Sequence, residues 1–186
     1  MIKLLERIGD YFIMMRKVIS KPMNYSIFIK QINLEFGKIG MSSIGIVLII
    51  SIFIGAVVTI QQYLNISDPL IAQYYIGLAT REAIILEFSP TMIALILAGK
   101  VGSNIASEIG TMRTTEQIDA LGVMGINPAS FLILPKIIAA IYFFPILVTL
   151  SIAIGLLGGW MGGISVGVLD VDFIKGLQTE FTSFYI

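Results

Sequence analysis

The sequence lacks two residue types completely and contains few charges. None of its 186 residues is cysteine or histidine, and only 13% are charged. Disulfides, thiolate or imidazole metal sites and a Ser-His-Asp catalytic triad are therefore excluded. Lysine plus arginine and aspartate plus glutamate number 12 each, so the net charge does not indicate nucleic-acid binding.

A phosphate-binding loop of the Gly-x-x-x-x-Gly-Lys-Ser/Thr type is also missing, because Gly37-Lys38 and Gly99-Lys100 are each followed by an apolar residue. This loop cradles the phosphates of ATP in many ATPases. Any ATP and its magnesium ion are therefore expected on another chain, and no cofactor or metal is expected on this one.

Apolar residues, in contrast, make up 56% of the chain, and the mean hydropathy is +0.93. A small soluble domain keeps much of its surface in water and cannot bury so many of them. Stretches 39–67 and 137–169 hold no charge, and 83–99 holds only Glu87, whereas a spanning helix needs about 20 apolar residues. The pattern predicts an all-α integral membrane protein. Its expected transmembrane helices are 42–63, 83–103 and 137–163.

The last charge-free stretch is longer than one straight crossing requires. At about 1.5 Å per residue it would extend about 50 Å, against a hydrocarbon core of about 30 Å. We expect it to tilt, to kink at Pro145, or to break within the glycine-rich segment 158–163.

Lysine and arginine are distributed asymmetrically about the predicted spans. Only Arg81 and Lys175 lie on one side, and the other ten precede the first span or flank or lie in the segment between the second and third. The positive-inside rule then places the N-terminus and residues 104–136 in the cytoplasm and residues 164–186 outside, as a periplasmic segment.

The first 40 residues form an amphipathic segment rather than a signal peptide, because the first long apolar run begins too late. An apolar stripe with helical spacing ends at Pro22, where a helix cannot continue. The stripe predicts a helix that lies in the membrane interface, and a helix packed on the protein itself is the alternative. Its residues are Leu5, Ile8, Phe12, Met15 and Ile19.

The segment 107–128 contains the signals of a short helix. Thr114 followed by Gln117 fits a capping box, Gly125 suits the position after the last turn, and Pro128 prevents continuation. A simple connection needs only about four or five residues. A docking surface and a well-formed structural loop are both consistent with this pattern.

Glu87 and Lys136 are the charged residues at the predicted spans that suggest specific roles. Glu87 is an intramembrane carboxylate followed by Pro90, which marks a candidate functional site. Alternatively, it stays hydrated near the interface or pairs with Arg81. Lys136, at the start of the third span, is interpreted as an anchor beside lipid phosphates.

Small residues recur every four positions in two places, a pattern that lets helix backbones approach closely in lipid. General enrichment of glycine in membrane helices is the alternative, and the second set also fits a broken helix. The sets are Ala98, Gly102, Ala106 and Gly110, and Gly155, Gly159, Gly163 and Gly167.

The run from Leu86 to Pro135, together with the adjoining Lys136, carries five motifs in succession. They are Glu87-Phe88-Ser89-Pro90, Ala98-Gly99-Lys100-Val101-Gly102-Ser103, the run from Glu108 to Leu121, Gly125-Ile126-Asn127-Pro128 and Leu134-Pro135-Lys136. This series resembles the MlaE family of ABC transporter permeases, the membrane subunits of Mla and Mce-type lipid transport systems. Weaker similarity extends over nearly the whole chain.

The resemblance implies a homodimeric inner-membrane permease that moves phospholipid between the inner and outer membranes. A separate ATPase subunit would receive the coupling helix at about 115–124, and a periplasmic MCE-domain protein would cap a lipid cavity. The implied coupling residues are Glu108, Arg113, Thr115, Glu116, Gln117, Asp119, Ala120 and Leu121. The implied cavity residues are Ile60, Tyr63, Glu87 and Pro90. The small-residue positions Ala98, Gly102, Ala106, Gly155, Gly159 and Gly163 would serve helix packing.

Members of this family carry two more transmembrane helices, so the chain resembles a permease that is incomplete at its C-terminus. A membrane-embedded enzyme would need a nucleophile–base pair or a metal cluster, and Glu87 has no second acid on a matching helix face. The chain is therefore not expected to be an enzyme. A membrane scaffold without a transport role, or an inactive fragment of such a permease, is the alternative.

Overall fold

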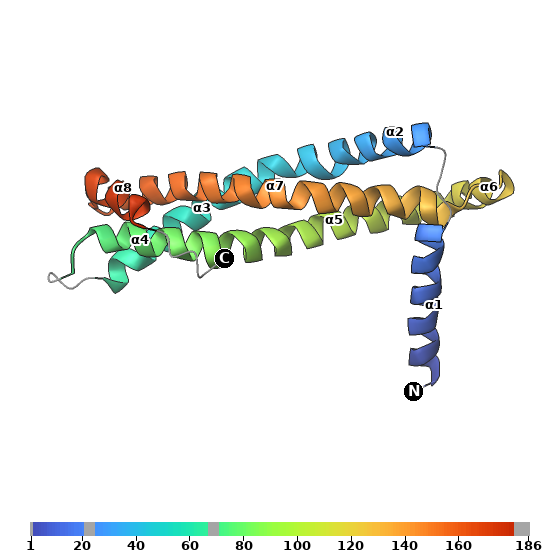
Figure 1. Cartoon of the computed structure of the whole chain (residues 1–186), viewed down its shortest axis with the longest axis horizontal. Coiled ribbons are helices and arrows are strands. Elements are labelled where there is room, and N and C mark those ends of the chain that lie inside the picture. Colours follow the sequence, from blue (N-terminus) through green and yellow to red (C-terminus); the bar gives the residue numbers. More distant parts are fainter. Residues whose placement is uncertain (1, 21–24, 67–70, 181–186) are drawn as a thin grey trace. The chain divides into compact units, whose positions relative to one another are not determined.

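The structure is a computed structural model that describes residues 2–20, 25–66 and 71–180, and every regular element in these ranges is a helix. The all-α prediction is therefore confirmed for this part of the chain. The elements, labelled in Figure 1, are α1 (Ile2–Ser20), α2 (Tyr25–Glu35), η1 (Phe36–Met41), α3 (Ser42–Asn65), α4 (Tyr74–Ala83), η2 (Ile84–Phe88), α5 (Ser89–Thr114), α6 (Gln117–Val123), α7 (Pro128–Ser165) and α8 (Asp170–Gln178).

Three helical runs are long and apolar enough to cross a membrane: Ser26–Asn65, Tyr74–Thr114 and Pro128–Ser165. The chain is thus a multi-pass membrane protein, and the number of predicted spans is confirmed. Each run has 38 to 41 residues, which at about 1.5 Å per residue is about twice the hydrocarbon thickness. Turns at the ends of each run therefore extend beyond the membrane core.

The third run does not break at its glycines. Helix α7 continues without interruption past Pro145 and through 158–163 to Ser165, so the predicted break is wrong. Close contacts with α3, described below, hold these glycines in the helix. Gly167, with φ +89°, lies in the turn after α7, where a residue without Cβ adopts this conformation at little cost.

Two turns of the long runs are π-helical, η1 in the first run and η2 in the second. A π-turn contains one residue more than an α-turn, and such turns are frequent at functional sites. Glu87 lies within η2, and Pro90, which has no backbone N–H to donate, lies two residues after the end of this turn.

The described chain forms two compact units. The first comprises residues 1–42 and 99–144, and the second comprises 43–98 and 145–186. The first unit has a small apolar core, in which Phe36, Ile105 and Phe144 pack around buried residues. Those buried residues are Ile39, Val101 and Ala139.

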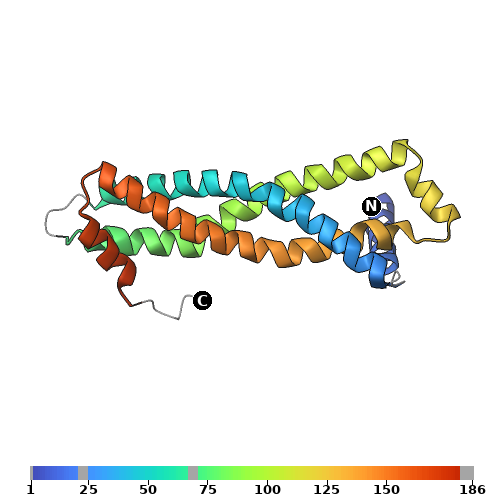
Figure 2. The same cartoon turned by 90° about the horizontal axis from the view of Figure 1, so that it is seen from above.

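In the second unit, α3 and α7 pack backbone to backbone (Figure 2). A Cβ added at Gly55 would overlap the carbonyl oxygen of Gly155, and one at Gly162 would lie 2.7 Å from the Cα of Ala56. Only residues without side chains allow this approach, which maximises dispersion contacts where lipid removes the hydrophobic driving force.

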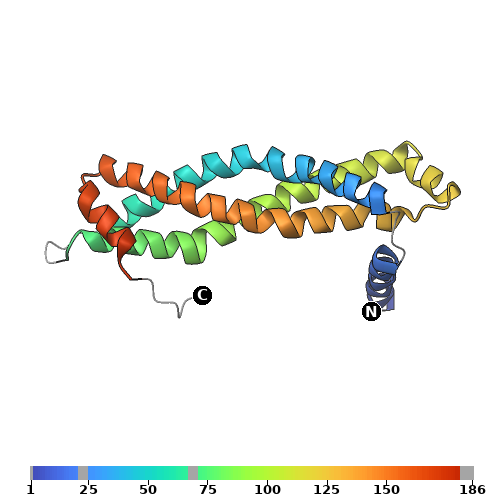
Figure 3. The same cartoon turned by 45° about the horizontal axis from the view of Figure 1, so that its top comes forward.

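Helix α8 packs against α4 at one end of the second unit (Figure 3). Phe173 of α8 is fully buried and joins Ile76 and Val168 in an apolar cluster. The buried Arg81 at the end of α4 donates hydrogen bonds to the carbonyls of Leu177, at 2.9 Å, and Thr179, at 2.6 Å. This cation thereby closes the C-terminal end of α8, where carbonyls lack helical partners.

Helix α1 exposes most of its predicted apolar stripe within the first unit. Ile8, Phe12 and Ile19 are exposed, Met15 is half-buried, and Val18 is buried. The stripe is therefore available for a membrane surface, and the interfacial location remains a prediction. The side chain of Leu5, Pro22 and residues 181–186 lie outside the described part of the chain.

Candidate functional site

The short helix α6 presents its surface to solvent between the second and third long runs. None of its residues is buried, and Val123 is 90% exposed. At its end, Gly125 has φ +75°, its N–H donates to the carbonyl of Gly122, and the N–H of Ile126 donates to the carbonyl of Leu121. This is the Schellman arrangement, so the predicted glycine stop is confirmed.

The predicted capping box at the start of α6 is wrong. The N-cap residue is Glu116, which has a left-handed backbone (φ 57°) and makes no side-chain cap. The hydroxyls of Thr114 and Thr115 instead donate to the carbonyl of Thr111. The physical reason is that α5 continues to Thr114, so these hydroxyls satisfy its final turn rather than the next helix.

The other predicted coupling residues lie on or beside α6. Gln117, Asp119 and Ala120 are exposed, and Leu121 is half-buried. Arg113, in the last turn of α5, pairs with Asp119 at 3.1 Å. The pair links the end of α5 to α6 and so helps to orient α6. Because both side chains are well exposed, the pair contributes less than about 1 kcal/mol to the stability of the protein.

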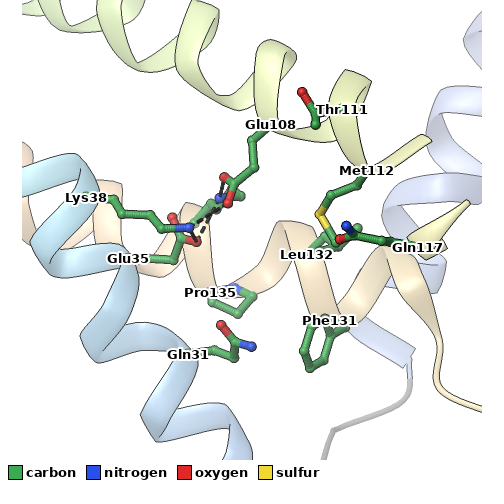
Figure 4. A pocket seen from close by; sticks show the side chains of 11 residues that line it. Gln31, Glu35, Lys38, Glu108, Thr111, Met112, Gln117, Phe131, Leu132 and Pro135 are labelled. Carbon is green, nitrogen blue, oxygen red and sulfur yellow. Dashed lines mark hydrogen bonds and ion pairs between the residues drawn. The ribbon is translucent and has the colours of Figure 1, made fainter. Parts of the chain in front are cut away.

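Four charged side chains of the first unit form a connected network, which we call the ion network: Glu35, Lys38, Glu108 and Lys136. Figure 4 labels Glu35, Lys38 and Glu108 and marks the ion pairs with dashed lines. The Nζ of Lys136 lies 2.7 Å from a carboxylate oxygen of Glu35 and also pairs with Glu108. The other oxygen of Glu108 lies 2.6 Å from the Nζ of Lys38. The two negative and the two positive charges cancel, and the four side chains join α2, η1, α5 and α7.

The network corrects the interpretation of Lys136 as a lipid anchor. Its side chain is only 5% exposed and contacts two carboxylates, because α2 and α5 both present an acid towards α7 at this level. Glu108, predicted as a coupling residue, is correspondingly engaged with two lysines. Its position on α5, six residues before the end of that helix, connects the network to the segment that carries α6.

A cavity of about 470 Å³ opens beside the ion network (Figure 4). Gln31, Phe131 and Gln117 are among its lining residues, so the first residue of α6 and the network share one space. The second carboxylate oxygen of Glu35 is buried and has no hydrogen-bond partner among the described residues.

A second cavity, of about 450 Å³, lies in the second unit and contains Glu87. Its wall combines apolar residues with the amides of Gln61 and Gln62 and the carboxyl of Glu82. Glu87 is exposed and makes no hydrogen bond or ion pair within the described ranges, and Arg81 is buried against α8 instead. The proposed pairing of Glu87 with Arg81 is therefore absent.

The remaining predicted cavity residues do not line this space. Tyr63 is half-buried and packs against the cluster of Ile76, Val168 and Phe173. Ile60 and Pro90 are half-buried and lie outside the cavity wall. Of the predicted set, Glu87 alone lines the cavity.

The two sets of small residues have different surroundings. A Cβ added at Gly159 would lie only 2.7 Å from the Oγ1 of Thr59 on α3, whereas one added at Gly163 would lie at ordinary van der Waals distance, 3.5 Å, from the same side chain. Ala98, Gly102 and Ala106 of α5 are exposed, and nothing lies within 4 Å of a Cβ added at Gly102.

Several site residues were not identified from the sequence. Glu35 lies three residues after Ile32 and one before Phe36, so it falls within an apolar stripe and faces inward, a signal that was available. Gln61, Gln62 and Glu82 carry no comparable signal, because their proximity to Glu87 depends on how the helices pack.

Comparisons with known proteins agree with these features. The profile of a family described as Permease MlaE matches residues 32–186. A probable ABC transporter permease protein of Rickettsia bellii (strain RML369-C) is 36% identical over 193 aligned positions, which cover 100% of this chain and 70% of that protein. A probable ABC transporter permease protein of Synechocystis is 34% identical over 156 positions, 81% of this chain and 57% of the relative.

The Haemophilus influenzae intermembrane phospholipid transport system permease protein MlaE is 32% identical over 178 positions, which cover 94% of this chain and 66% of that protein. The chain therefore spans about two thirds of the length of these curated relatives.

Proposed function

The chain belongs to the MlaE permease family, and on this premise we propose that it is the membrane permease subunit of an ABC-type transporter. Its cargo is phospholipid, moved between the inner and outer membranes, and ATP is hydrolysed on a separate subunit. The name of the Haemophilus relative supports this cargo. The chain itself catalyses no covalent reaction and presents the lipid with cavity states whose populations the ATPase shifts.

The observation that carries the proposal is the exposed helix α6 between two membrane-spanning runs. Its glycine-capped end and the Arg113–Asp119 pair hold it in one orientation. Val123 and Met124 at its tip are exposed apolar residues, which a groove of a partner protein would bury favourably. This helix is the coupling helix in our proposal.

The cavity around Glu87 is the proposed lipid site. Its apolar residues offer acyl chains a lipid-like wall, and Glu87, Gln61 and Gln62 offer hydrogen-bonding groups to a polar head group. We place it towards the periplasmic side, with the N-terminus in the cytoplasm. Most lysines and arginines precede the first span or flank or lie in the segment between the second and third, and the positive-inside rule assigns those segments to the cytoplasm. The functional unit is a homodimer beneath a periplasmic MCE-domain protein.

The first test is affinity purification from native membranes in mild detergent, with mass spectrometry of the retained proteins. An ABC ATPase is expected with the parent protein. Val123→Asp introduces a charge at the tip of α6 and is expected to reduce the recovered ATPase by about tenfold, equivalent to about 1.4 kcal/mol of binding.

Val171→Asp is the matched control, because Val171 is a similarly exposed valine on the short helix α8. It is expected to leave the recovered ATPase unchanged. Recovery of the parent protein without any ATPase would contradict the proposal and favour the membrane scaffold instead.

A second prediction concerns the lipid that purifies with the protein. Glu87→Ala removes the exposed carboxylate from the cavity wall and is expected to lower the retained phospholipid by about tenfold, as for a lost head-group contact of about 1.4 kcal/mol. Lipid extraction with mass spectrometry measures this. Thr91→Ala, at an exposed position one turn further along the helix, serves as the control. Equal phospholipid on both variants would exclude Glu87 from the lipid site.

A further inference from the structure

A chain of buried hydroxyl groups joins the three long helical runs inside the second unit. Ser51 of α3, Ser151 of α7 and Ser89 of α5 are all buried, with relative exposures of 2–3%. The Oγ atoms of Ser51 and Ser151 lie 2.9 Å apart, and those of Ser151 and Ser89 lie 3.2 Å apart. We call these three residues the serine node.

The direction of the hydrogen bonds in the serine node is fixed at one end. Ser51 Oγ lies 2.6 Å from the carbonyl oxygen of Val47, which can only accept, so the single hydroxyl proton of Ser51 points there. Ser151 must then donate to Ser51, and Ser89 must donate to Ser151. Every hydroxyl therefore donates once, which avoids the cost of an unpaired polar group in an apolar interior.

The node adjoins the π-turn that carries Glu87. Ser89 is the residue directly after η2, and Glu87 lies two positions earlier. On the other side of the turn, α4 is fixed by its packing against α8 and by the bonds from Arg81 to Leu177 and Thr179. The π-turn thus lies between two anchored segments.

We expect the π-turn to convert to an α-turn when one of its anchors is released, because π-helical hydrogen bonding is rare and occurs mostly as single turns inside α-helices. One residue of register corresponds to a rotation of about 100° about the helix axis. Such a rotation would direct the side chain at position 87 away from the cavity formed with Gln61 and Gln62.

We propose that Ser51, Ser89 and Ser151 are positioning residues that hold the π-turn in register and so keep Glu87 directed into the cavity. The inference rests on the proposed function, in which that cavity receives the lipid. The structural part of the proposal, the direction in which the side chain at position 87 points, can be measured without any lipid.

The test uses the absence of cysteine from the chain. Glu87→Cys and Glu82→Cys place single thiols at two lining positions of the same cavity, and their reaction rates with a membrane-impermeant maleimide are measured in purified protein. Ser151→Ala is expected to lower the rate at position 87 by about tenfold relative to position 82, as the thiol moves from an open cavity to a packed helix face.

A comparison of threonine and valine at position 151 distinguishes the effect of the hydroxyl from the effect of packing, because the two side chains have nearly the same shape. Ser151→Thr should keep the labelling ratio of the parent, and Ser151→Val should reproduce the effect of alanine. Ser103→Ala removes an exposed hydroxyl that, within the described part of the chain, donates to the carbonyl of Lys100 on its own helix, and it should leave the labelling ratio unchanged. Equal ratios for the threonine and valine variants, or an unchanged ratio for alanine, would overturn the proposal.

Retained phospholipid is measured on the same samples. If Ser151→Ala leaves the labelling ratio unchanged while the parent protein retains phospholipid, the proposed role of the serine node is refuted and the proposed cargo is not. A clear labelling effect in a parent protein that retains no phospholipid refutes the proposed cargo and leaves the node intact.

Discussion

Replacing Lys136 by methionine is expected to destabilise the protein by about 3–5 kcal/mol, the cost of removing one partner from a buried ion pair. Lys136 is 5% exposed and is the cation shared by Glu35 and Glu108. Without it, the buried carboxylate of Glu35 and the 28% exposed carboxylate of Glu108 lose the cation that they share, and the second oxygen of Glu35 is already without a hydrogen bond within the described residues. Thermal unfolding in detergent, followed by the single tryptophan, measures the change.

Removing the two carboxylates together with Lys136 should restore much of the stability that the single substitution costs. The triple variant Lys136→Met, Glu35→Gln and Glu108→Gln keeps no charge of the ion network except that of Lys38, and neutral replacements of a buried ion network are often tolerated. Lys38 loses its partner in this variant but is about half exposed, so water solvates it. Lys30→Met, at an exposed position of α2, is the matched control and should not change stability. A single Lys136→Met variant as stable as this control would show that the ion network is dispensable.

Replacing Gly55 by alanine is expected to have a comparably large effect through packing. The added Cβ would overlap the carbonyl oxygen of Gly155 and lie 2.7 Å from its carbonyl carbon and 2.8 Å from the backbone nitrogen of Gly159. These are backbone atoms, so α3 and α7 must separate to accommodate it. We expect a loss of about 3 kcal/mol, at the upper end of overpacking costs, visible as reduced monodisperse protein after size exclusion.

Gly45→Ala provides the matched control for this packing prediction. Gly45 lies on the same helix α3, and nothing lies within 4 Å of a Cβ added there. This variant should purify like the parent protein. Similar behaviour of the Gly45 and Gly55 variants would show that the close contact between α3 and α7 does not determine folding.

Much of the fold follows from the sequence because charge is costly in a hydrocarbon environment. The absence of charge in residues 39–67 and 137–169 predicts two spans directly, and the third follows although Glu87 interrupts it. The end of α6 was equally predictable, because Gly125 adopts a left-handed conformation that few other residues tolerate.

Local patterns were less informative where two elements compete for the same residues. Thr114 matched the start of a helix, yet its hydroxyl serves the end of the preceding one. The glycines of 158–163 matched a helix break, yet contacts with α3 keep them helical. In both cases the deciding interaction involves a neighbour that the local sequence does not specify.

The sequence by itself determined that the described part of this protein is helical, that it has three helical runs long and apolar enough to cross a membrane, and that a short helix follows the second run. Those properties depend on hydropathy and local backbone preference, which are encoded over a few consecutive residues. Only the tertiary structure decided that Lys136 meets Glu35 and Glu108 and that three serines form one node. These contacts join residues up to about a hundred positions apart, and helix packing alone brings them together.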